Sequence, residues 1–186
     1  MKMQTVQDEN LRVSISFWFV TVLCLMFLID EQSFSLLSLS AFFLHEFTHI
    51  FFVVVFGGRV TEFSLSLGEM NIKTEREFLG KIQNIVVSLS APLLNLLLAI
   101  LFWEKYRSFA EINAVIGFFQ LLPIISLDGD VALESLKVSL FIRKTISFVL
   151  IFAFAVLGFA LLLYSKYNFT LLFVSFYLLF ITCKTS

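Results

Sequence analysis

The chain has 186 residues, of which 59% are hydrophobic and only 15% are charged, and its mean hydropathy is +0.95. This composition lies far outside the range of soluble proteins and predicts an integral membrane protein. The formal net charge of −1 provides no basic surface, so we expect no nucleic-acid partner. At this length a single domain over residues 1–186 is expected, with no room for a separate soluble domain.

Six apolar stretches with little or no charge follow one another along the chain. Each is close to the roughly 20 residues that a helix needs to cross a bilayer, although the fourth barely reaches that length. We therefore predict an all-α polytopic protein of the cell membrane with about six transmembrane helices. The predicted spans are residues 13–29, 34–56, 82–103, 112–127, 145–165 and 167–183.

Lysines and arginines are unevenly distributed between the loops. If the N-terminus is cytoplasmic and the six spans alternate, only Lys105, Arg107 and Lys166 lie outside. This asymmetry obeys the positive-inside rule, so both termini are predicted to be cytoplasmic. The basic residues placed inside are Lys2, Arg12, Arg59, Lys73, Arg76, Lys81, Lys137, Arg143, Lys144 and Lys184.

The segment between the second and third predicted spans has a different pattern. Val60, Phe63, Leu65 and Leu67 keep a rough alternation with polar residues, and Gly68 offers a turn. This pattern predicts a short β-hairpin over residues 60–72, associated with the cytoplasmic face of the membrane and exposing a strand edge.

The second predicted span contains polar residues that are costly in a bilayer. His45 and His49 are the two histidines of the chain, and Glu46 follows the first of them. A spacing of four residues places both imidazoles on one face of a helix. Two histidines and an adjacent glutamate form the HExxH pattern, in which the histidines bind zinc and the glutamate acts as general base.

A third protein ligand must come from elsewhere, and the candidates are Asp128, Asp130 and Glu134. Pro123 disfavours a continuous helix, and Gly129 gives the backbone freedom to turn Asp128 towards the histidines. Asp130 suits a helix-capping role, so we favour Asp128 as the third ligand of one Zn²⁺ ion. Glu134 would be the ligand in an unrelated HExxH protease.

Asn95 is a further polar residue within an apolar span, three residues after Pro92. Its amide could stabilise an oxyanion or hold a substrate backbone, or it could form an ordinary hydrogen bond between helices. Residue chemistry alone favours neither interpretation.

The predicted topology fixes the depth of the site. His49 lies seven residues before the cytoplasmic end of its span at Phe56, which is roughly 10 Å along a helix. Asp128 follows a span that also runs towards the cytoplasm. We therefore expect the site in the cytoplasmic half of the bilayer.

These motifs resemble those of the site-2 protease family, the intramembrane zinc metalloproteases. The resemblance is to the small bacterial branch that includes the pro-sigma-factor-processing protease of spore formers, and it covers a core of residues 34–134 without a PDZ or CBS domain. It implies that His45, His49 and Asp128 are metal ligands and that Glu46 is the base. It also implies an active-site role for Asn95, and a substrate segment held as an added strand beside the hairpin.

Three residues depart from the family pattern. Thr48 replaces the glycine of HELGH, Gln120 stands where asparagine is usual, and Asp130 replaces the second glycine after Asp128. None of these changes removes a ligand or the base.

The sequence thus predicts a zinc metalloendopeptidase that cleaves a membrane-embedded or membrane-adjacent segment of a protein in regulated intramembrane proteolysis. Its expected partners are the bilayer, a transmembrane protein or peptide substrate, and a regulatory membrane protein. The alternative is a catalytically inactive zinc-binding homologue that acts as a membrane scaffold. A metal transporter is disfavoured because the polar cluster does not extend across the bilayer.

Overall fold

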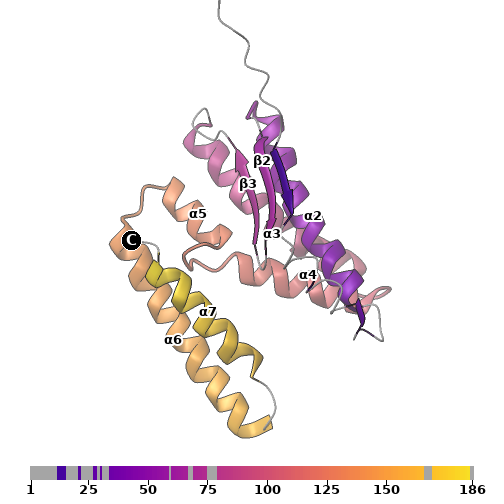
Figure 1. The fold of residues 1–186 in the computed structure, drawn as a ribbon, viewed down its shortest axis with the longest axis vertical. Coiled ribbons are helices and arrows are strands. Elements are labelled where there is room, and N and C mark those ends of the chain that lie inside the picture. Colours follow the sequence, from indigo (N-terminus) through magenta and orange to yellow (C-terminus); the bar gives the residue numbers. More distant parts are fainter. Residues whose placement is uncertain are drawn as a thin grey trace, which may run out of the picture.

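The computed structural model describes residues 12–15, 21, 27–28, 30, 34–58, 60–66, 69–74, 79–165 and 169–184. Within these residues the chain forms three strands and six helices (Figure 1). In chain order they are β1 Arg12–Ile15, α2 Phe34–Val55, β2 Val60–Ser66, β3 Glu69–Thr74, α3 Lys81–Phe102, α4 Arg107–Gln120, α5 Asp128–Ser135, α6 Leu140–Ser165 and α7 Thr170–Lys184.

Three of the described helices, α2, α3 and α6, are long and apolar enough to cross a bilayer. Large apolar side chains such as Phe51, Leu97 and Phe152 are exposed on them, as expected for surfaces that contact lipid. The chain is therefore a helical membrane protein. The two predicted spans over residues 34–56 and 82–103 agree with α2 and α3 to within a residue.

The other predicted spans differ from the helices that form. Helix α4 ends at Gln120, before Pro123, and has only 14 residues, while α7 has 15. Helix α6 begins at Leu140, five residues before the predicted start, and so includes Arg143 and Lys144. The count of six spans is accordingly not confirmed.

The start of the first predicted span is wrong. Residues Arg12–Ile15 form strand β1, which pairs in parallel with β2 and is not helical. Backbone pairing with an existing strand therefore outweighs the apolar pattern at this point, and the fold is not strictly all-α. Most of residues 16–29 lie outside the described part of the chain.

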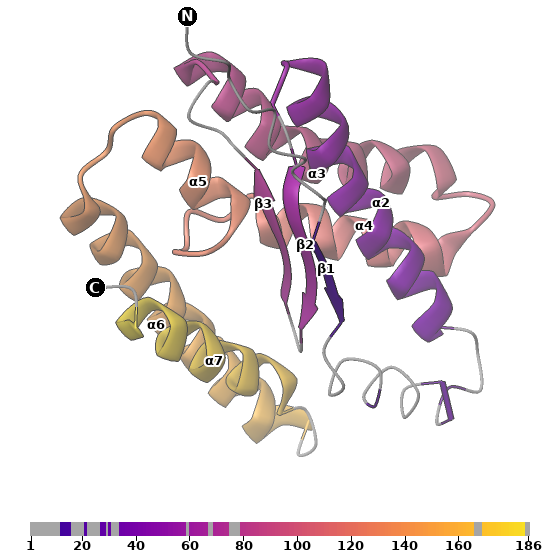
Figure 2. The same ribbon diagram turned by 45° about the horizontal axis from the view of Figure 1, so that its top comes forward.

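Strand β2 is the central strand of a three-stranded sheet in the order β1-β2-β3. It pairs antiparallel with β3, with Ser64 opposite Asn71 and Ser66 opposite Glu69. The two strands of the predicted hairpin thus lie side by side, but β1 covers the other edge of β2. Within the described sheet, β3 is left as the edge strand on the side of α5 (Figures 1 and 2).

Helices α2, α3 and α4 pack together on one side of the molecule (Figure 2). Asp30 caps α2, because its carboxylate accepts hydrogen bonds from the backbone N–H groups of Phe34 and Ser35. Helices α3 and α4 approach closely at Gly117, where a Cβ would lie 2.9 Å from the carbonyl oxygen of Pro92. A larger residue at position 117 would force the two helices apart.

Helices α6 and α7 form a pair that extends away from α2, α3 and α4 (Figure 1). The short helix α5 lies between the two groups and packs against α3 on one side and α6 on the other. An apolar cluster of Ile124, Leu127, Ile151 and Leu178 joins the segment before α5 to the helix pair. This segment carries Asp128 to the histidines of α2.

Candidate metal centre

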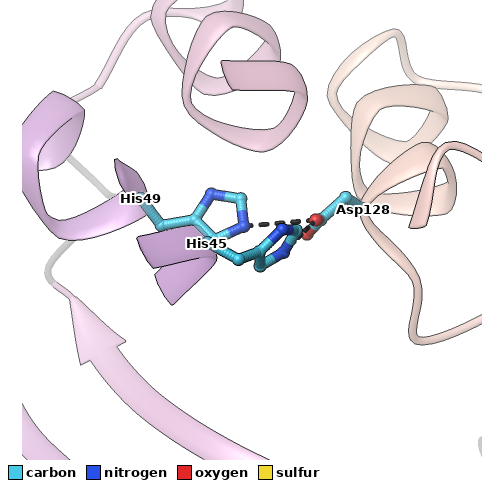
Figure 3. A group of neighbouring side chains, drawn as sticks. All are labelled: His45, His49 and Asp128. Atoms are coloured by element: carbon cyan, nitrogen blue, oxygen red, sulfur yellow. Dashed lines mark hydrogen bonds and ion pairs between the residues drawn. The ribbon is translucent and has the colours of Figure 1, made fainter. Parts of the chain in front are cut away.

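His45 and His49 lie on the buried face of α2 and point towards Asp128, the first residue of α5 (Figure 3). One oxygen of the Asp128 carboxylate is 3.0 Å from Nε2 of His45 and 3.2 Å from Nε2 of His49. The aspartate is 79 residues beyond His49 in the chain. The fold therefore brings the three predicted ligands together.

The spacing of these atoms suits a zinc ion. Zinc with bonds of about 2.1 Å in a tetrahedral arrangement keeps its ligand atoms about 3.4 Å apart. The two observed nitrogen–oxygen distances are close to that value, and one donor atom from each residue lies within 4.8 Å of the others. Two imidazoles and one carboxylate are also a typical donor set for catalytic zinc, so the residues fit this ion.

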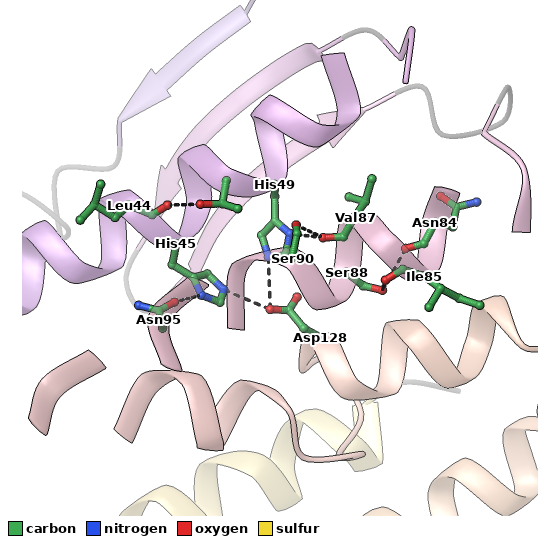
Figure 4. A network of polar contacts seen from close by, with 11 residues as sticks. Leu44, His45, His49, Asn84, Ile85, Val87, Ser88, Ser90, Asn95 and Asp128 are labelled. Carbon is green, nitrogen blue, oxygen red and sulfur yellow. Dashed lines mark hydrogen bonds and ion pairs between the residues drawn. The ribbon is translucent and has the colours of Figure 1, made fainter. Parts of the chain in front are cut away.

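The other ring nitrogen of each histidine is held by a carbonyl oxygen on α3 (Figure 4). Nδ1 of His49 is 2.8 Å from the backbone oxygen of Val87, and Nδ1 of His45 is 2.7 Å from Oδ1 of Asn95. Because these oxygens only accept, each Nδ1 must donate its proton. Nε2 then carries the lone pair that a metal ligand needs, which is the usual way a protein orients such a histidine.

Asn95 is itself oriented by Asn113 on α4, a residue that no sequence motif singled out. The amide Nδ2 of Asn95 donates to Oδ1 of Asn113, and Nδ2 of Asn113 donates to the backbone oxygen of Phe109. Because the backbone oxygen of Phe109 can only accept, Asn113 must turn its Nδ2 towards it and its Oδ1 towards Asn95. Asn95 in turn presents its Oδ1 to Nδ1 of His45. Asn113 is completely buried. An amide in the apolar stretch of residues 112–127 was the signal that could have identified it.

These contacts bear on the predicted role of Asn95. Its oxygen and its nitrogen both have partners within the protein, and the side chain is buried behind His45. The geometry therefore supports a role in holding His45 in place. Contact of Asn95 with substrate or with an oxyanion stays a prediction.

Asp128 reaches the histidines because of the turn that precedes it. Ser126, between the break at Pro123 and the start of α5, has a positive φ of 79°. At Gly129 a Cβ would lie 2.6 Å from the carbonyl oxygen of Leu122 and even closer to that of Leu121. Only glycine therefore allows this close approach of α5 to the preceding turn.

The other two candidate ligands lie elsewhere. Asp130 was expected to cap the helix, but both of its carboxylate oxygens accept hydrogen bonds from the guanidinium of Arg143 on α6, so this expectation is wrong. Glu134 also contacts Arg143, and its side chain is 65% exposed. Among the described residues, the acid that joins the histidine pair is Asp128.

Glu46 is half-buried on α2, within electrostatic reach of His45, His49 and Asp128. This position is compatible with the predicted role of a base beside the metal.

Thr48, in place of the usual glycine, donates its hydroxyl hydrogen to the backbone oxygen of Leu44 at 2.7 Å. Its polar group is thus satisfied within its own helix, and it disturbs none of the contacts of the histidines.

The protonation of Asp128 fits a ligand role. Asp128 belongs to α5, which lies outside the three candidate spans. Burial by itself raises the pKa of this carboxyl group. A protonated Nε2 of His45 or His49, whose proton a bound metal ion would replace, outweighs that effect by donating to the carboxylate, so the pKa of Asp128 lies below its ordinary value. The group is therefore an anion at neutral pH, as metal binding requires.

Comparisons with known proteins identify the fold. No protein-family model and no curated protein matches the chain in sequence. A solved structure of a site-2 protease from Methanocaldococcus jannaschii is similar, with a TM-score of 0.60 and 17% sequence identity. The similarity covers 97% of this chain and 93% of that chain.

Together, the helices and the structural match define a helical membrane protein with the site-2 protease fold. The resemblance to the site-2 protease family that the motifs indicated is thus confirmed at the level of the fold.

Proposed function

We propose that the chain is an intramembrane zinc-dependent endopeptidase that cleaves a membrane-embedded or membrane-adjacent segment of a protein substrate. The observation that carries this proposal is the meeting of His45, His49 and Asp128 beside Glu46. These are a zinc-binding donor set and a base, and they occur in a fold shared with a site-2 protease.

The proposed ligands are His45, His49 and Asp128, which would hold one zinc ion. When bound, zinc would polarise the scissile carbonyl and lower the pKa of water. Glu46 accepts the proton of the attacking water and passes it to the nitrogen of the leaving amine. Asn95 and the Val87 carbonyl keep the two imidazoles in the required tautomer during this exchange.

The substrate segment is proposed to bind in an extended form, because a peptide bond within a helix is shielded from attack. An extended peptide can pair with the edge of a sheet. Strand β1 already covers one edge of β2, so β3 is the edge to which we assign the substrate. This edge lies on the side of α5, which carries Asp128 (Figure 2).

The site is proposed to lie in the cytoplasmic half of the bilayer, with both termini in the cytoplasm. The distribution of basic residues supports this orientation. Trp103 and Tyr106, beside the exposed Arg107, suit the opposite interface, where amphipathic aromatic rings gather. A membrane-tethered regulatory protein or a remnant peptide in the bilayer is the kind of substrate that such a site can reach.

The proposal is tested with purified protein and a panel of membrane-anchored candidate substrates. We expect wild type to hold one zinc ion per chain and to cleave, whereas Glu46→Gln retains zinc and cleaves at least about 100-fold more slowly. Cleavage by Glu46→Gln at the wild-type rate would defeat the mechanism. If wild type binds zinc and cleaves nothing, the alternative of an inactive scaffold is favoured.

The metal content of two further variants tests the ligand set. Asp128→Ala is expected to lose zinc, and Glu134→Ala is expected to retain it because Glu134 faces solvent and Arg143. The reverse result would replace Asp128 by Glu134 as the third ligand.

A further inference from the structure

The proposed ligand Asp128 lies on α5, a helix that is not stable without packing against other parts of the protein. Helix α5 has eight residues, and its N-cap residue, Leu127, provides no side-chain cap. Isolated helices of this length are unstable in water, because packing supplies most of their stability. The turn before it includes the unfavourable positive φ of Ser126. The position of Asp128 must therefore be set by its neighbours.

Helix α6 contacts the chain two residues after Asp128. The guanidinium of Arg143 donates to both carboxylate oxygens of Asp130, with Nε 2.7 Å from Oδ1. The Asp130 side chain is buried, and Arg143 is almost equally enclosed. Such a two-point pair fixes orientation as well as distance, because the guanidinium is planar and rigid.

The same face of α6 also contacts the chain three residues before Asp128. The hydroxyl oxygen of Ser147 accepts a hydrogen bond of 2.9 Å from the backbone N–H of Ile125. Ser147 is fully buried and stands four residues after Arg143, so both side chains project from one side of the helix. Arg143 and Ser147 thus hold the segments on either side of the ligand.

The histidines are held by a different set of contacts. His45 and His49 are fixed through Asn95 and Val87 of α3. The imidazoles are therefore presented by α2 and oriented by α3, whereas the carboxylate is presented by α5, which packs against both α3 and α6.

We propose that Arg143, through its ion pair with Asp130 and assisted by Ser147, is the positioning residue that keeps the Asp128 carboxylate in reach of both histidines. This inference rests on the proposed function, since it assigns these residues to the proposed metal centre. It also explains the charge at position 130, where the related pattern has glycine. The pair neutralises Arg143 at the start of an apolar helix.

The test measures zinc affinity by competition with a chromophoric chelator, in detergent, at a temperature at which each variant is folded. Arg143→Lys keeps the charge but loses the two-point geometry, and Ser147→Ala removes the second contact. We expect each to weaken zinc binding about tenfold, the lower end of the range for residues that act through a ligand. The visible spectrum of the cobalt(II)-substituted protein should change in both.

Two control variants separate positioning from general effects of charge. Arg107→Gln breaks an exposed ion pair with Glu111, and Glu134→Gln removes only the exposed partner of Arg143. Both are expected to bind zinc as tightly as wild type, with an unchanged cobalt spectrum.

The outcomes are distinguishable. If wild type binds neither zinc nor cobalt, the proposed function fails. If wild type binds and both Arg143→Lys and Ser147→Ala bind with the same affinity and spectrum, the positioning role is wrong although the metal centre stands. If Arg143→Lys does not fold, the zinc affinity and cobalt spectrum of Ser147→Ala alone decide whether the positioning role holds. In metal-free protein, faster hydrogen exchange at Ile125 in Ser147→Ala would support the role, and unchanged exchange would oppose it.

Discussion

At the scale of single residues, Gly129 gives the sharpest prediction about the turn that presents Asp128. A side chain there would collide with the carbonyl oxygens of Leu121 and Leu122. We expect Gly129→Ala to destabilise the protein by about 1–3 kcal/mol, the usual cost of overpacking, and to weaken zinc binding because Asp128 is displaced. Thermal melting in detergent and zinc titration measure the two effects.

The matched control is Gly80→Ala. Gly80 precedes α3 with φ of −65°, and among the described residues a Cβ there would meet the Gln83 side chain at an ordinary 3.5 Å. Melting and zinc affinity should match wild type. Equal behaviour of the two alanine variants would show that the turn before α5 is not as tightly packed as described.

Asn113 carries the second prediction at this scale. Asn113→Leu keeps a similar volume but removes the acceptor for Asn95, so the chain of hydrogen bonds that orients His45 is broken. Zinc affinity should fall about 10- to 100-fold, as is typical when the partner of a ligand is lost. Asn84→Leu on α3 is the control, because the Asn84 side chain donates to the backbone oxygen of Leu79 and, among the described residues, has no hydrogen bond to the histidines. Equal affinities of the two variants would refute this account.

The sequence predicted the ligands better than it predicted their supports. His45, Glu46 and His49 form a local pattern, and Asp128 follows from a proline break and a glycine. Asn113 and Arg143 act through contacts between distant helices, which spacing along the chain does not reveal. Asp130 was assigned to a cap because its partner, 13 residues away, could not be known.

At the scale of secondary structure, charge explains where the predictions succeeded and failed. The bounds of α2 and α3 were predicted because apolar runs coincide with these helices. Helix α6 was predicted to start at Thr145, since Arg143 and Lys144 interrupt the apolar run. Pairing with Asp130 removes the penalty for Arg143, and the helix begins earlier. Strand β1 was interpreted as helix because its pairing partner lies about 50 positions along the chain.

The sheet yields a prediction about the substrate. In a variant without Cys24 and Cys183, a cysteine introduced at Ile72 of β3 should form a disulfide with a cysteine near the cleavage site of a substrate. A cysteine at Val13 of β1 should not, because β1 lies at the far side of the sheet. Stronger crosslinking from position 13 would place the substrate at β1 and contradict its assignment to β3.

At the scale of the whole molecule, the distribution of charge predicts the orientation in the membrane. A fluorescent protein fused after Ser186 should fluoresce in the cytoplasm, and alkaline phosphatase fused there should be inactive. Alkaline phosphatase inserted near Lys105, between α3 and α4, should be active because that loop is expected outside. Active phosphatase at the C-terminus would contradict the proposed topology.

The claim that this fold carries a working protease is tested most directly in cells, where every membrane protein is a candidate substrate. New protein termini in membranes are quantified by mass spectrometry from cells that produce wild type and from cells that produce Glu46→Gln at the same level. The account predicts termini within or beside transmembrane segments that require wild type and vanish in the variant. An identical set of termini in both would contradict it.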